Sequence, residues 1–137
     1  MTISNLDELL KNMKPNLKNE KYFIGSFDDQ YLMNLSGYLD YIVCVYKEKE
    51  GLTVIFSDDI LDDMKDLTER IQGPFALITL EVNSDLMAVG FMAKIADALA
   101  KEKISCNAVS AYHHDHIFVQ YERKEAALTA LKKLSEK

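Results

Sequence analysis

The order of the predicted elements constrains this chain more than any other feature. From Phe75 onward, apolar residues follow the pattern strand, helix, strand, strand, helix. The three strands are predicted at residues 75–82, 104–111 and 117–121. The apolar stripes of the two helices are Phe91, Ile95 and Leu99, and Ala127, Leu128, Leu131 and Leu134. This order predicts an α+β unit with a small antiparallel sheet.

The first half of the chain repeats this order in a less regular form. A short helix is predicted at residues 6–13, and strands at 22–27, 41–47 and 52–56, with Gly51 in the turn that joins the last two. A helix with Ile60, Leu61 and Met64 follows, and the pair Gly73 and Pro74 is expected to end this half. We therefore predict two units in tandem, residues 1–72 and residues 73–137.

Composition and charge exclude several classes of function. The chain has 137 residues, 16 Lys and Arg, 22 Asp and Glu, and a formal net charge of −6. Proteins that bind nucleic acid or anionic membranes present basic surfaces, so we expect neither partner. No apolar run approaches the roughly 20 residues that span a bilayer, and the N-terminal stretch MTISNLDELL lacks the features of a signal peptide. We expect a cytoplasmic protein.

The segment YHHDHIF at residues 112–118 contains all three histidines of the chain. Its candidate metal ligands are His113, His114, Asp115 and His116. Neighbouring side chains of a strand point to opposite faces, and a structural zinc site requires about four converging ligands. The catalytic motifs GxSxG and HExxH are absent from the sequence. We predict neither a metal nor a catalytic site here, and a metal-binding protein that uses this segment is the alternative.

The stretch GPFALITLEVNSDLMAVGFMAKIADALAKEKISCNAVSAYHHDHIFV, which begins at Gly73, resembles an ACT domain. It is most similar to the short tandem ACT-domain proteins, formerly a domain of unknown function, and LDELLKNMKPNL and EGLTVIFSDD resemble the first half of that family. The resemblance implies ferredoxin-like βαββαβ units in tandem, with antiparallel sheets and helices on one face. It also implies a regulatory module that is not an enzyme and needs no cofactor. Such modules bind small molecules, usually amino acids, at an interface between ACT units.

The predicted ligand site lies where the loop NSDLMAVG enters the long helix. A helix N-terminus has unpaired N–H groups and a partial positive charge, which suit a carboxylate. Asn83, Ser84 and Asp85 are the polar candidates, and Ser84 or Asp85 is expected to cap the helix. Leu86 and Val89 are expected to form apolar walls, and Gly90 to permit close approach. The loop lacks the proline of the compact Asp-x-Pro-Gly arrangement that is commoner in the family.

Two residues of the following strand complete the predicted site. Asn107 offers both an amide donor and a carbonyl acceptor, which can hold the ammonium and the carboxylate of an amino acid. Ala108 is expected to add a further apolar wall. ACT domains that bind amino acids have an asparagine at the corresponding strand position, so the resemblance implies the same role for Asn107.

A homodimer is the expected assembly. The strand at residues 108–111 carries small or apolar residues on both faces, whereas a lone α+β sheet should be polar on its uncovered face. Either the sister half or a second chain is therefore expected to cover it. One further alternative is a protein-interaction module that binds no ligand and uses its sheet edges.

Overall fold

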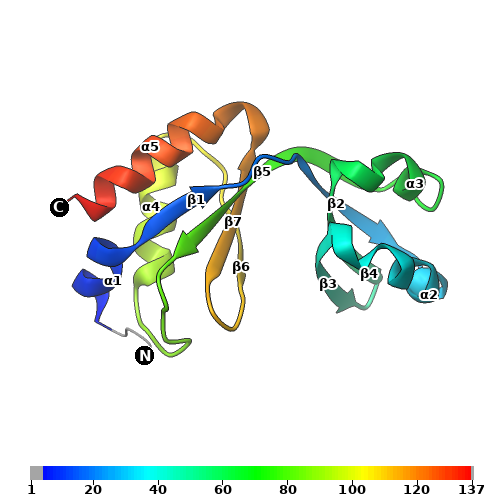
Figure 1. The fold of residues 1–137 in the computed structure, drawn as a ribbon, viewed down its shortest axis with the longest axis horizontal. Coiled ribbons are helices and arrows are strands. Elements are labelled where there is room, and N and C mark those ends of the chain that lie inside the picture. Colours follow the sequence, from blue (N-terminus) through cyan, green and yellow to red (C-terminus); the bar gives the residue numbers. More distant parts are fainter. Residues whose placement is uncertain (1–4, 137) are drawn as a thin grey trace. The chain divides into compact units, whose positions relative to one another are not determined.

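The computed structural model describes residues 5–136, which fold into two compact units (Figure 1). The first, the split unit, contains the described residues of Met1–Asn19 together with those of Ala76–Lys137, and the second, the inserted unit, is Glu20–Phe75. This differs from the expected division between residues 72 and 73, because the first residues of the chain pack with its last third. Leu9 and Met13 are 0% and 1% exposed in the core of the split unit.

The inserted unit has the order strand, helix, strand, strand, helix, strand. Its elements are β2 (Tyr22–Phe27), η1 (Asp29–Tyr31), α2 (Leu32–Leu35), η2 (Ser36–Tyr41), β3 (Ile42–Glu48), β4 (Gly51–Ser57), η3 (Asp58–Ile60), α3 (Leu61–Lys65) and the start of β5 (Ile71–Glu81). The sheet order is β3-β4-β2-β5, and all neighbours are antiparallel. Phe27, Phe56 and Met64 lie in the core between this sheet and the helices. The predicted hairpin is confirmed, with Gly51 at φ 145°.

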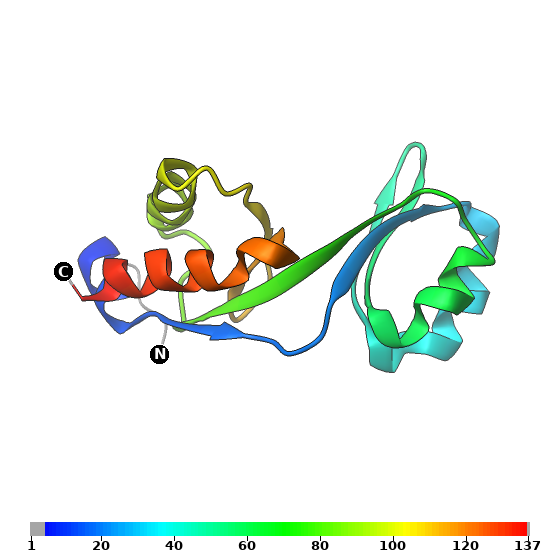
Figure 2. The same cartoon turned by 90° about the horizontal axis from the view of Figure 1, so that it is seen from above.

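The split unit reaches the same arrangement with a strand from each end of the chain. Its elements are α1 (Leu6–Asn12), β1 (Lys14–Leu17), the rest of β5, α4 (Phe91–Lys101), β6 (Asn107–Ser110), β7 (Asp115–Gln120), η4 (Tyr121–Arg123) and α5 (Lys124–Ser135). The sheet order is β1-β5-β7-β6. Residues of α4 and α5 share one core with β5 and β7, and both helices lie on the same side of the sheet (Figure 2). The predicted α+β, ferredoxin-like class with helices on one face is confirmed for both units.

Gly73 and Pro74 lie next to the end of the inserted unit at Phe75, but they do not interrupt the secondary structure there. Both lie inside the long strand β5. The pairing of β2 with β5 shifts between Tyr22↔Phe75 and Ile24↔Gln72, so the pair occupies a bulge. Proline lacks a backbone N–H but is tolerated at bulges, where the ladder of hydrogen bonds is already interrupted. The strand therefore continues through a sequence that normally marks a turn.

Candidate functional site

Ser84 and Asp85 lie on the loop between β5 and α4, and the side chain of each makes a hydrogen bond. Ser84 is 8% exposed, and its Oγ donates to Oδ2 of Asp115 at 3.4 Å. Oδ1 of Asp85 accepts from the N–H of Met87 at 2.8 Å, and its carbonyl accepts from Ala88 at 2.9 Å. Neither side chain caps α4, contrary to expectation, because Ser84 bonds to Asp115 and Asp85 bonds to the N–H of Met87. Asn83 is half-buried in the same loop.

The N-terminus of α4 has no side-chain cap in the described chain. Gly90 is the N-cap, at φ 92° and ψ −8°, and its carbonyl accepts from the N–H of Lys94 at 3.0 Å. A Cβ at Gly90 would meet Leu6 Cδ2 at 3.4 Å, which is ordinary contact, so the positive φ rather than crowding favours glycine. The amides of the first turn therefore form the positive end of an 11-residue helix without a side-chain acceptor at the cap.

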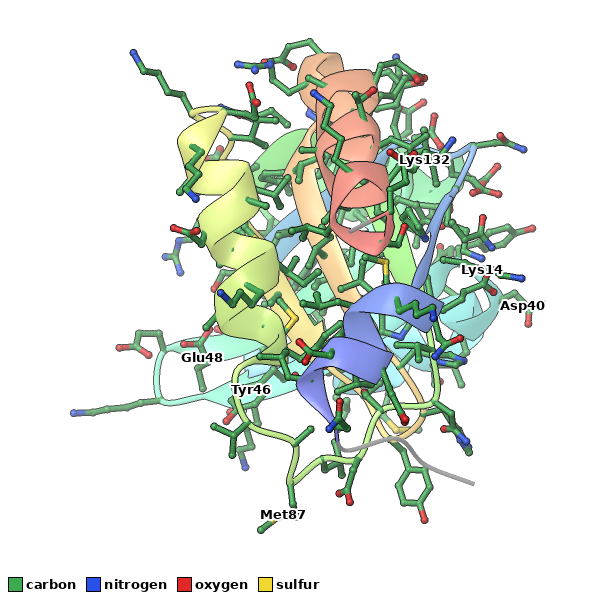
Figure 3. All side chains as sticks on the ribbon, turned by 90° about the vertical axis from the view of Figure 1, so that its left-hand side faces the viewer. Lys14, Asp40, Tyr46, Glu48, Met87 and Lys132 are labelled. Carbon is green, nitrogen blue, oxygen red and sulfur yellow. The ribbon has the colours of Figure 1, made fainter. Side chains whose placement is uncertain are left out.

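The apolar residues of this loop face solvent. Leu86, Met87 and Val89 are 61%, 83% and 84% exposed, and Met87 extends away from the ribbon (Figure 3). Leu86 and Val89, which were expected to wall a pocket, are therefore largely exposed in the isolated chain. Met87 was not among the predicted site residues, although it lies in the same apolar run.

Asn107 and Ala108 lie on β6, the edge strand of the split unit. Asn107 is opposite Phe118 and donates from Nδ2 to the carbonyl of Phe118 at 3.5 Å. Ala108 is opposite Ile117, which belongs to the core, so Ala108 faces the helices and Asn107 faces the other side. The two residues therefore do not point into one space.

The structure also separates Asn107 from the loop within one chain. Ser84 contacts Asp115, which pairs with Ser110 at the far end of β6. Asn107 lies three residues earlier in that strand, about 10 Å along it, and β7 stands between β6 and β5. The two parts of the predicted site do not meet inside the split unit.

The histidines have separate partners. His114 Nδ1 lies 3.1 Å from the carbonyl of Val82, and His116 Nδ1 lies 3.0 Å from Thr79 Oγ1. His113 is exposed. Within residues 5–136, no group of three or more His, Cys, Asp or Glu side chains could hold a metal ion. Through His114 and His116, the segment instead forms hydrogen bonds between the hairpin of β6 and β7 and the end of β5.

His116 makes stability depend on pH. Burial, with a smaller contribution from His114, lowers the pKa of its imidazole below the usual value of about 6.5. The unfolded chain therefore binds a proton more readily than the folded chain. This contribution to stability is complete above about pH 6.5 and is lost as pH falls through the lower folded pKa.

We expect His116→Gln to weaken the loss of stability between pH 7 and pH 5, measured as the urea midpoint at each pH. His113→Gln is the matched control, because His113 is exposed on the neighbouring turn and should leave the pH profile unchanged. Equal profiles for the native chain and His116→Gln would contradict this assignment.

A groove that the sequence did not reveal lies between α1, α4 and α5, with a volume of about 520 Å³. Its lining is mixed: it includes the apolar side chains of Leu6, Leu10 and Leu134, the lysines Lys94, Lys101 and Lys133, and the acidic residues Asp7, Asp97 and Glu102. Leu6 and Leu10 belong to the helix predicted at residues 6–13, but the sequence did not indicate that they would line a groove. None of the predicted site residues lines it.

Among the helices of residues 5–136, every one is too short or too polar to span a bilayer.

Two ACT-domain family models match the chain in tandem, over residues 1–64 and residues 72–133. The chain belongs to the ACT-domain family as a tandem ACT protein. Its fold is similar to that of the regulatory subunits of aspartate kinase from Thermus flavus and Thermus thermophilus. No curated protein matches the chain.

Solved structures extend this likeness over nearly the whole chain. A Vibrio cholerae protein of unknown function, described as a possible transport protein, is 36% identical over 95% of each chain, with a TM-score of 0.78. The ligand-free regulatory subunit of aspartate kinase from Thermus thermophilus is 12% identical, over 91% of this chain and 97% of that one, with a TM-score of 0.69. Aspartokinase III from E. coli, solved with aspartate and ADP, is 13% identical, over 92% of this chain and 35% of that one, with a TM-score of 0.66.

Proposed function

We propose that this tandem ACT protein is a cytoplasmic sensor that binds a small amino-acid-like molecule and has no catalytic activity of its own. Its action then depends on a separate protein, or on its own assembly as a homodimer, because allostery requires a second site whose equilibrium the ligand changes. The matched domains of the aspartate kinases are regulatory, which supports a regulatory role here.

The observation that carries the proposal is the open N-terminus of α4. Gly90 leaves the first-turn amides without a side-chain cap, and the positive end of the helix favours a carboxylate there. Asn83, Ser84 and Asp85, on the preceding loop, are the proposed polar neighbours of the ligand. A carboxylate bound by these amides would form charge-assisted hydrogen bonds, which are stronger than neutral ones.

In the proposed site, Asn107 comes from the split unit of a second copy of the chain. It is exposed on an edge strand and, within one chain, lies away from the loop. A ligand held between two ACT units would contact the α4 terminus of one and Asn107 of the other. Burial between units would also cover Leu86 and Val89, which are exposed in the isolated chain.

The exposed loop supports a second candidate function. Three large apolar side chains that are more than 60% exposed, Leu86, Met87 and Val89, are characteristic of protein-interaction surfaces. A module that binds a protein and no small molecule would use this loop directly. The two functions differ in whether a free metabolite stabilises the protein.

A thermal-shift screen against amino acids and their close metabolites separates the two functions. A ligand at about 100 times its Kd stabilises the folded chain by about 2.7 kcal/mol, which raises Tm by several degrees for a chain of this size. We expect at least one amino-acid-like compound to do so. The absence of any shift, in a preparation shown to be folded by circular dichroism, would favour the interaction module.

Asn107→Ala should abolish the shift produced by that compound and leave the Tm of the free protein nearly unchanged, because Asn107 is exposed. Ser110→Ala is the matched control, since Ser110 is also exposed on β6 and is outside the proposed site. A shift that survives Asn107→Ala would place the ligand elsewhere. The groove between α1, α4 and α5 would then be tested with Lys101→Ala.

A further inference from the structure

The two units carry very different charges. The inserted unit, residues 20–75, has 12 Asp and Glu against 5 Lys and Arg, whereas the rest of the chain has 10 Asp and Glu against 11 Lys and Arg. The negative net charge of the chain therefore belongs to the inserted unit. A surface of one sign attracts partners of the opposite sign and speeds their association.

Most acidic residues of the inserted unit lie on the helical segments that cover its sheet (Figure 2). These segments are residues 28–41, with η1, α2 and η2, and residues 58–68, with η3 and α3. They contain eight aspartates, and Lys65 is their single basic residue. Leu35, Ile60 and Met64 of the same segments are buried against the sheet. All eight aspartates are exposed: Asp28, Asp29, Asp40, Asp58, Asp59, Asp62, Asp63 and Asp66.

Three large apolar side chains are exposed on the same segments. Leu32, Met33 and Leu39 are 53%, 79% and 63% exposed, although Leu35 lies between them in the chain and is 2% exposed. Gly37 follows Met33 by four residues, and a side chain added there would meet no neighbouring segment within 4 Å. The surface beside Met33 is therefore open to a partner. We call the three apolar residues and the eight aspartates the helical surface.

Tyr38 connects the two parts of the helical surface. The negative charge of Asp63, which also accepts a hydrogen bond from the Tyr38 hydroxyl, raises the pKa of that hydroxyl, and Asp66 contributes in the same direction. η2 also contacts η3. Leu39 stands between Tyr38 and Asp40 in the chain, so it lies beside the aspartates of both segments. Exposed apolar side chains and acidic residues are therefore neighbours here.

We infer that the helical surface binds a basic amphipathic helix of another protein. The apolar face of such a helix would cover Leu32, Met33 and Leu39, and its lysines or arginines would pair with the surrounding aspartates. A methionine suits this role, because its unbranched side chain adapts to the shape of a partner. Large exposed apolar side chains that are bordered by polar residues are typical of protein-binding surfaces.

Charge argues against other occupants. A second copy that presents the same surface would place eight aspartates and one lysine against an identical set, and like charges across an interface oppose association. The split unit of a second copy is nearly neutral, so it offers little attraction. Nucleic acids and anionic membranes are repelled for the same reason. A partner that is both basic and apolar on one side satisfies both parts of the surface.

The test uses the full chain and a fluorescent synthetic peptide as the probe. The peptide has about 18 residues of leucine and lysine, with the leucines on one face of the helix. A second peptide has the same composition in an order that leaves no apolar face, and a third has glutamate in place of lysine. We expect fluorescence anisotropy to show saturable binding of the first peptide, with a Kd at least about ten times lower than that of either other peptide.

Met33→Ser tests the apolar part of the surface. It should raise the Kd of the first peptide about tenfold, because it removes a central apolar contact without changing the charge. Met87→Ser is the matched control, since Met87 is 83% exposed but lies in the split unit. Equal effects of the two substitutions would overturn the inference, because the peptide would then bind without using the helical surface.

The double variant Asp62→Asn and Asp66→Asn tests the acidic part. It should raise the Kd about threefold or more at low salt and less at high salt, because ions screen exposed charges. Glu122→Gln with Glu125→Gln is the matched control, since both glutamates are exposed in the split unit and the change in charge is the same. Equal Kd values for the two double variants would show that net charge alone attracts the peptide.

The three peptides also decide whether the surface recognises an amphipathic helix. Failure of the first peptide to bind, or equal binding of the peptide without an apolar face, would overturn the inference. This surface goes beyond the proposed ligand site and does not depend on it. A failed metabolite screen leaves the anisotropy result unaffected, and a chain that binds no peptide could still bind a metabolite.

Discussion

A fragment of residues 73–137 will not fold cooperatively, although it contains the C-terminal ACT domain that the sequence predicts. It lacks β1, which pairs with β5 from Lys14↔Glu81 to Leu17↔Ile78. It also lacks Leu9 and Met13, whose side chains are almost fully buried in the same core. Loss of one such side chain costs about 2–5 kcal/mol, so the loss of both, together with a strand, exceeds the stability of a small domain.

A circular permutant tests whether the fragment fails to fold because it lacks residues 5–19. In it, residues 5–19 follow residue 136 through a flexible linker, and the chain starts at residue 76. α5 packs against both α1 and β1, so the new connection joins elements that are already neighbours (Figure 2). Urea unfolding followed by circular dichroism should show a cooperative transition for the permutant and none for the fragment. A cooperative transition in the fragment would show that the first residues are dispensable.

Phe56→Ala should destabilise the inserted unit by about 3–5 kcal/mol, measured as the change in the free energy of unfolding in urea. Phe56 is 0% exposed, and its ring lies 6.1 Å from that of Phe23 and 6.3 Å from that of Phe27. Its removal leaves a cavity and eliminates both aromatic contacts. The smallness of the unit increases the effect, because few other side chains can close over the gap.

Tyr112→Ala serves as the exposed control for this substitution. Tyr112 is 80% exposed on the turn before β7, and its loss should change the free energy of unfolding by less than about 0.5 kcal/mol. If the Phe56 and Tyr112 variants were destabilised equally, the core of the inserted unit would be packed differently from the structure. Near-UV circular dichroism would then show whether the native aromatic environment was already loose.

The element order was the most predictable part of the fold. Alternating apolar residues and the helical spacing of Phe91, Ile95 and Leu99 indicated the strands and the long helix because burial imposes these periods. β1 was missed because KPNL is four residues long and contains a proline, so it has too little alternation to be recognised as a strand. It becomes a strand through its pairing with β5, which is a tertiary effect.

The continuation of β5 through Gly73 and Pro74, and the actual cap of α4, were missed for related reasons. Gly73 and Pro74 are strong turn signals, but the bulge in β5 accommodates them inside a strand. Ser84 and Asp85 are typical N-cap residues, yet each satisfies a different hydrogen bond earlier in the loop. Local preferences identify which residues can cap or break an element. The surrounding structure decides where they do so.

The candidate site was only partly predictable. The sequence located the loop that precedes α4 and identified Gly90, whose positive φ the structure shows. The faces of Asn107 and Ala108 depend on the register of β6 with β7, which a short strand next to an irregular turn does not specify. The exposure of Leu86 and Val89 was not predictable either, because an apolar residue in a loop can line a pocket or face another molecule.

The chain leaves the split unit and returns to it at adjacent points. The N–H of Lys18 donates to the carbonyl of Leu77 at 2.9 Å, immediately beside both crossings. A tight turn could therefore join these two strands in place of the 56 residues of Glu20–Phe75. Removal of the inserted unit at this point should leave the strands of the split unit in place, because domains tolerate insertion and deletion where the two ends of the inserted segment lie close together.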